Sequence, residues 1–136
     1  KIKKINLKTP DKFPYFENDV VVIRSNEGSG SEIKVLSGRW GIVNKVGEFS
    51  CEVKVCNGLL EDVRAEELEG VKLSDEDKES AIALMGRLQK LAEIEIVDEL
   101  VNEIIWGIGK KEKIKLTPLQ NEILTLIEKR LNRLEN

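Results

Sequence analysis

Histidine is absent from this sequence of 136 residues, and with it the side chain that most often carries protons in enzymes. A serine or cysteine nucleophile would lack its usual base, and zinc would lack a common nitrogen ligand. Carboxylates are plentiful, but turns, helix starts and solubility account for their positions, as at Glu66-Glu67 and Asp75-Glu76-Asp77. We therefore expect no catalytic residues, no metal site, no cofactor and no enzymatic activity. A hydrolase that uses paired carboxylates is the alternative.

Cysteine is scarce, with Cys51 and Cys56 as the only two. They lie five residues apart in a predicted strand, where ~3.3 Å per residue places their Cα atoms ~16 Å apart and their side chains on opposite faces. A disulfide needs its two Cα atoms within ~7 Å. We therefore predict two reduced thiols that do not pair with each other, as is usual in a cytoplasmic protein.

Long apolar runs are missing as well. No segment approaches the ~20 apolar residues that cross a bilayer, and the lysine-rich beginning lacks the apolar centre of a signal peptide. We expect a cytoplasmic protein with no membrane insertion. Aromatic residues make up only 4% of the chain and the net charge is −3, so nucleic acid is a disfavoured partner. The charge is uneven, since residues 1–12 and 110–115 are basic and residues 74–105 are acidic.

Short strand patterns fill residues 17–73. An apolar run over 19–24 predicts one strand, and the alternation over 49–56 predicts another, with Phe49, Cys51, Val53 and Val55 on its core face. Further strands are predicted at 40–46, 59–63 and 69–73. The dipeptide Asn57-Gly58 is a strong hairpin signal.

Two glycines and a tryptophan stand close together in Gly38-Arg39-Trp40-Gly41-Ile42-Val43. We predict that Gly38 permits a tight turn before the strand and that Gly41 permits a bend or bulge within it. With the flanking strands, this motif resembles the small barrels of the Src-homology-3-like or KOW type over residues 17–73. The resemblance implies a five-stranded antiparallel barrel that holds a partner, with a long first loop at 25–32 and a tight helical turn at 64–68.

The same resemblance suggests where a partner binds. KOW-type modules contact RNA or protein through this region, which implies Arg39, Trp40 and Lys45 as candidate partner-binding residues. Arginine beside tryptophan suits stacking on an exposed base. The alternative is that Trp40 fills the mouth of the barrel and Arg39 is solvated.

Helical patterns replace strand patterns after residue 73, so the chain is predicted to be α+β. Ser74 is a helix cap, and the apolar stripe that follows continues to about residue 107 but changes phase near Ile94. Residues 75–107 form either one helix kinked near Glu93 or two helices that meet there. A second start signal, Thr117-Pro118-Leu119-Gln120, predicts a helix over 118–134. The predicted domains are a basic, proline-broken arm (1–16), the barrel (17–73) and a helical extension (74–136).

The helical extension carries more apolar surface than a small barrel can cover. Two arrangements bury it: a symmetric dimer, or a hairpin within one chain in which the last helix folds back antiparallel against the stripe of Val97, Val101 and Ile104. The candidate self-association residues are Val97, Val101, Ile104, Leu119, Ile123, Leu126 and Leu134.

Together these patterns predict a non-enzymatic protein-binding or assembly module built on a small barrel, with a protein partner and self-association as a homodimer. Barrels of similar layout serve as accessory subunits of larger assemblies. The alternatives are a KOW-type factor that contacts RNA or DNA, and a small regulator from a mobile or defence element.

Overall fold

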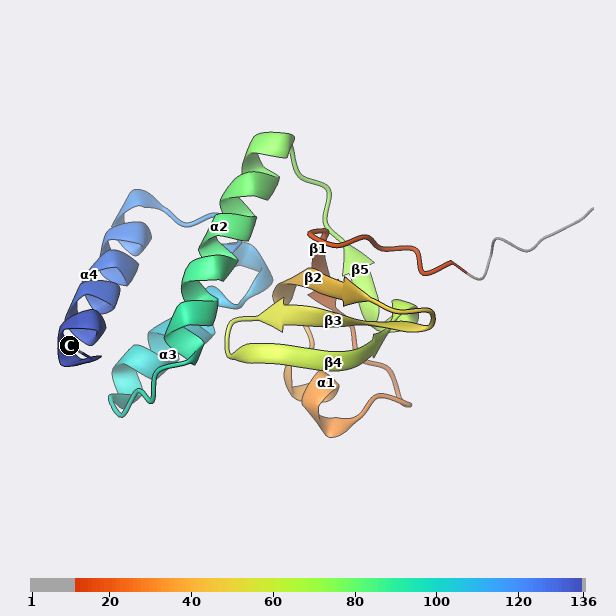
Figure 1. The fold of residues 1–136 in the computed structure, drawn as a ribbon, viewed down its shortest axis with the longest axis horizontal. Helices are drawn as coiled ribbons and strands as arrows, with labels where there is room; N and C mark the ends of the chain where they lie inside the picture. Colours follow the sequence, from red (N-terminus) through yellow and green to blue (C-terminus); the bar gives the residue numbers. More distant parts are fainter. Residues whose placement is uncertain (1–11, 136) are drawn as a thin grey trace, which may run out of the picture.

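The structure is a computed structural model that describes residues 12–135, and the side chains of residues 12–132. Most of the predicted basic arm therefore lies outside the described residues. Over the described part the fold is α+β, with a five-stranded antiparallel sheet followed by helices (Figure 1). The strands are β1 (Val20–Ile23), β2 (Trp40–Val46), β3 (Ser50–Val55), β4 (Gly58–Arg64) and β5 (Leu68–Gly70). The α-helices are α1 (Ser31–Val35), α2 (Asp75–Ala92), α3 (Glu99–Ile108) and α4 (Pro118–Glu135), and the 3₁₀ turns are η3 (Ala65–Glu67) and η4 (Lys111–Lys113).

The strands lie in the order β4-β3-β2-β1-β5, with every neighbouring pair antiparallel. No ladder joins the edge strands β4 and β5 among the described residues, so the sheet is open and the predicted closure into a barrel is not confirmed. The first four strands and the tight turn η3 lie where the sequence predicts them, whereas β5 ends at Gly70, three residues before the predicted end at residue 73. The predicted first loop, residues 25–32, is interrupted at Ser31 by α1. The short helix α1 within residues 17–73 was not predicted.

Both faces of the sheet are covered, which explains why β1 is an uninterrupted apolar run. Val20 and Val22 point to one face, where they join Trp40 in a core shared with the helices. Val21 and Ile23 point to the other face, into a core made by the strands and α1. A strand that is buried on both faces cannot alternate apolar with polar residues.

The fold requires glycine at Gly38 and at Gly41 for different structural reasons. Gly38 has φ +87°, a left-handed conformation that suits glycine, and it leads into β2 as predicted. A Cβ atom at Gly41 would lie 2.6 Å from the carbonyl oxygen of Lys54, so Gly41 is required by close approach of β3. The bulge in the β2–β3 ladder lies later, between Val43 and Lys45, so of the two predicted features, a bend or a bulge, the bulge is not at Gly41.

The core face of β3 is confirmed for three of its four predicted residues. Cys51, Val53 and Val55 are buried, whereas Phe49 is 76% exposed. Phe49 lies outside β3 in the turn that Gly47 closes by donating its backbone N–H to the Ser50 carbonyl, 2.8 Å away. Residues in a turn do not follow the two-residue period of a strand, so the predicted core face begins at Cys51 and not at Phe49.

The acidic stretch forms two helices, so the second of the two predicted arrangements is correct. The helix α2 begins after Ser74, whose side chain accepts the N–H of Asp77, and it ends at Ala92. Six residues, 93–98, separate it from α3, which begins after Asp98, whose carboxylate accepts the N–H groups of Leu100 and Val101. Two separate axes account for the change of phase near Ile94.

The last helix packs on α2, a contact that the predicted hairpin does not include. Arg87 in α2 forms an ion pair of 2.6 Å with Glu128 in α4, and Lys115, just before α4, lies 3.5 Å from Asp77 at the start of α2. The two helices therefore run parallel, side by side, with α2 between α4 and the sheet (Figure 1). The capping box of Thr117 and Gln120 is confirmed by reciprocal hydrogen bonds of 2.9 and 3.2 Å.

Candidate functional site

Trp40 is a core residue. Its ring is fully buried between the sheet and the helices, and its Nε1 donates a 2.8 Å hydrogen bond to the carbonyl of Ile108 at the end of α3. A tryptophan held in this way cannot stack on a partner's base. Trp40 is therefore buried, but in a core that the sheet shares with the helices and not in the mouth of a barrel. Arg39, which the same alternative expected to be solvated, is partly buried.

Arg39 lies partly buried against a second tryptophan. Its guanidinium carbon is 3.4 Å from the ring centroid of Trp106, and its Nη1 donates to the Trp106 carbonyl. Burial lowers the pKa of Arg39, and the neighbouring Cys56 opposes that shift. Arg39 therefore joins the start of β2 to α3 through a cation–π contact, a role that no local pattern indicated. Of the three candidate partner-binding residues, only Lys45 is exposed, so they do not share one surface.

The two cysteines are free and buried on opposite faces of the sheet. Burial raises the pKa of Cys51 to about 11, and burial also raises the pKa of Cys56 although Arg39 opposes it. Thiols with raised pKa values are poor nucleophiles at neutral pH. Among the described residues, no group of three or more histidine, cysteine, aspartate or glutamate side chains could hold a metal ion.

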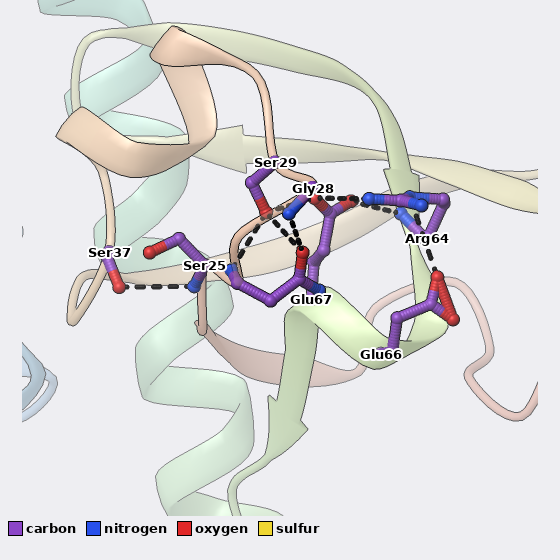
Figure 2. Close-up of polar contacts among 8 residues, drawn as sticks. Ser25, Gly28, Ser29, Ser37, Arg64, Glu66 and Glu67 are labelled. Atoms are coloured by element: carbon purple, nitrogen blue, oxygen red, sulfur yellow. Dashed lines mark hydrogen bonds and ion pairs between the residues drawn. The ribbon is translucent and has the colours of Figure 1, made fainter.

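Glu67, in the turn η3 before β5, is a charged residue whose side chain is buried (Figure 2). Ser29 donates to its carboxylate at 2.5 Å, and Arg64 donates from its backbone N–H at 3.0 Å and from its guanidinium at 3.2 Å. Burial alone would raise the pKa of Glu67, but these hydrogen bonds outweigh it and lower the pKa. Because every partner comes from this chain, the cluster fastens the first loop to the corner between β4 and β5. Nothing in the sequence distinguishes Glu67 from the exposed Glu66.

The candidate self-association residues divide into exposed and half-buried groups. Val97 is 83% exposed, Leu119 is 65% and Leu126 is 55%. Val101 and Ile104 are half-buried against the core, and the side chain of Leu134 lies outside the described residues. The face of α4 that packs within the chain is a different one, formed by Leu124 and Ile127.

Ile104 and Ile123 meet at a cavity between α3 and α4, with a volume of about 180 Å³. The other residues of its lining are Gly107, Ile108, Lys110, Lys113, Leu116 and Gln120. The lining is therefore apolar and glycine-containing, and two lysines are its only charged members. The sequence placed Ile104 and Ile123 in one self-association set, and the structure brings them together.

A second apolar hollow lies at the β2–β3 turn, where Phe13, Tyr15 and Phe16 line a cleft of about 600 Å³ with Val46. The hydroxyl of Tyr15 donates to the carbonyl of Leu68 at 3.2 Å, which holds this segment against the sheet. The ring of Phe16 is largely exposed, and so is the ring of Phe49, which follows the lining residue Glu48 in the sequence. Phe49 was missed as a surface residue because the strand pattern placed it in the core.

The sequence matches no protein-family model and no curated protein, so the site is interpreted from its own residues. Among residues 12–135, no helix combines the length and the apolar character needed to span a bilayer.

Proposed function

We propose that this protein is a non-enzymatic assembly module that forms a homodimer through its helical half and binds a further protein. One observation carries the proposal: α4 has a second apolar face, formed by Leu119, Ile123 and Leu126, in addition to the face that packs on α2. Residues spaced at four and three positions lie on the same side of a helix, so these three side chains form one stripe.

The exposed stripe has an energetic reason to find a partner. Burying a leucine or isoleucine side chain contributes about 1.5–3 kcal/mol, and Ile123 also lines the cavity shared with α3. Single exposed apolar residues are ordinary, but a stripe that continues into an apolar cavity is typical of an interaction surface. A second copy of the chain offers the same stripe, and a two-fold axis would bury both.

Sedimentation of the 136-residue chain tests this proposal. We expect twice the mass of one chain at micromolar concentration, and a single chain mass for the variants Leu119→Glu and Leu126→Glu, because a buried charge without a partner opposes association. Leu59→Glu is the matched control, since Leu59 is an exposed leucine on the edge strand β4 and should leave the dimer unchanged. A wild-type chain that sediments as a monomer at high micromolar concentration would contradict the proposal.

We also infer that the five strands are the small Src-homology-3-like or KOW-type barrel that the sequence resembles. The strand order, the tight turn η3 before β5 and the shared core of Ile33, Val43 and Val53 support this inference. On such a barrel, Phe16 and Phe49 are the exposed aromatic residues best suited to contact a protein partner.

Contact with RNA or DNA is a weaker candidate function. It depended on Trp40 and Arg39, and Trp40 is buried while Arg39 is engaged by Trp106. Phe16 and Phe49 could stack on bases instead, but the net charge of −3 opposes a polyanion. Nothing among the described residues favours the third candidate, a regulator from a mobile or defence element.

A further inference from the structure

The cavity between α3 and α4 is apolar inside and positively charged at its edge. Ile104, Leu116 and Ile123 supply its apolar lining, and Lys110 and Lys113 are its only charged residues. A Cβ atom added to Gly107, which also lines the cavity, would meet nothing within 4 Å. The cavity therefore has room above α3 for a side chain from another segment or another chain. Its two lysines favour a segment that also carries acidic residues.

The other end of α3 has the complementary character. Val97 is 83% exposed and Leu100 is 65% exposed, and acids surround them in the sequence at Glu95, Asp98 and Glu99. We call this segment, residues 95–100, the acidic tip. Within the described part of the chain, no ion pair engages Glu95 or Glu99 at the tip, or Lys110 or Lys113 at the cavity.

The acidic tip and the cavity lie at opposite ends of one helix of 10 residues, a length of about 15 Å. Leu100, Ile104 and Gly107 follow one another at spacings of four and three, so they share one face of α3. Leu100 and Gly107 are equally far from the midpoint of α3. A rotation that turns α3 end for end about this midpoint therefore exchanges Leu100 with Gly107, and the acidic tip with the cavity. A two-fold axis across the middle of α3 therefore matches each tip to the cavity of the other copy.

We propose that α3 pairs antiparallel with the α3 of a second copy, so that Leu100 of each copy enters the cavity of the other. Glu95 and Glu99 then face Lys110 and Lys113 across the interface. The inference rests on the proposed self-association and gives it an orientation. A second copy is the occupant because the chain itself carries both an exposed leucine flanked by acids and an apolar cavity flanked by lysines. Each dimer would make this contact twice.

Charge reversal tests the pairing. We expect Lys110→Glu/Lys113→Glu and Glu95→Lys/Glu99→Lys each to weaken the dimer by roughly tenfold or more, because each variant sets like charges opposite one another. Mixed together, the two variants should form a heterodimer of near wild-type affinity. In that heterodimer one contact is native and the other has both charges exchanged. Lys34→Glu/Lys45→Glu, an equal charge change at exposed residues of α1 and β2, is the control and should dimerise normally.

The readouts are sedimentation of each variant and of the mixture, with circular dichroism to show that each variant is folded. A wild-type monomer would contradict both the proposed function and this pairing. A wild-type dimer that tolerates either double reversal would contradict the pairing alone. So would two folded, monomeric variants that remain monomeric on mixing, since restored association is what opposite charges in contact require.

Discussion

At the scale of single residues, Gly41 and Gly86 differ in what an added methyl group would meet. At Gly41 a Cβ atom would lie 2.6 Å from a backbone oxygen of β3, whereas at Gly86, in the middle of α2, it would meet nothing within 4 Å. We expect Gly41→Ala to lower the free energy of unfolding by about 1–3 kcal/mol, since the strands must move apart. Gly86→Ala should raise it by about 1 kcal/mol, because alanine favours the helix.

Urea unfolding of the two variants checks this expectation, and each serves as the other's control because the chemical change is identical. Equal effects at both positions would contradict the assignment of Gly41 to close strand approach.

Single residues also show where prediction from the sequence fails. The alternation in β3 correctly predicts that Val53 and Val55 are buried. Buried Trp40 donates a hydrogen bond to the carbonyl of Ile108, which lies 68 residues away in the sequence. The residues next to Trp40 in the sequence could therefore suggest its burial only as one of two alternatives. Arg39 likewise depends on Trp106, 67 residues away. Local patterns predict the secondary structure of a residue better than its distant partner.

At the scale of elements, Glu67 connects the first loop, the end of β4 and the start of β5 (Figure 2). We expect Glu67→Gln to lower the free energy of unfolding by about 2 kcal/mol at neutral pH, because the hydrogen bonds from Ser29 and Arg64 lose the charge of their acceptor and one of its two oxygens. The lowered pKa of Glu67 sets the pH dependence. Its ionised form stabilises the fold above the ordinary glutamate pKa of about 4.3, and that contribution is lost as the pH falls through the lower folded value.

The measurement is the difference in unfolding free energy between wild type and variant from pH 7 down to about pH 3. This difference should be largest near neutral pH and shrink in acid. Glu66→Gln is the matched control, because Glu66 is exposed and only its 3.5 Å contact with Arg64 is lost. A difference that stays constant with pH would show that the ionised form of Glu67 does not stabilise the fold.

Elements were predictable where their signals are local. The start of α2 at Ser74 and the capping box before α4 involve residues within a few positions of one another, and both predictions are confirmed. The break after Ala92 was only one of two options, because no proline or glycine marks residues 93–98. The packing of α4 on α2 was missed, since it depends on Arg87 reaching residues 34–41 positions away.

At the scale of the whole molecule, the sheet and the helices share one core. Trp40 and Val22 of the sheet contact the same cluster as Met85 and Leu88 of α2. Trp106 of α3 packs against both clusters, so it connects the helices to the interior of the sheet. We therefore expect the predicted barrel and helical extension to unfold together as one cooperative unit, although the sequence divides them into two domains.

Two variants with one tryptophan each provide the measurement. In Trp106→Phe the fluorescence reports on Trp40 in the sheet, and in Trp40→Phe it reports on Trp106 in α3. Within each variant, the fluorescence transition in urea should coincide with the loss of helical circular dichroism, because neither half keeps a closed core without the other. A chain that ends at Leu73 is the complementary control: it would expose Trp40, Val20 and Ile42 to water, and we expect no cooperative transition from it. Separate midpoints for tryptophan fluorescence and helix content would instead show two independently folded domains, and the shared core would then be a docking contact between them.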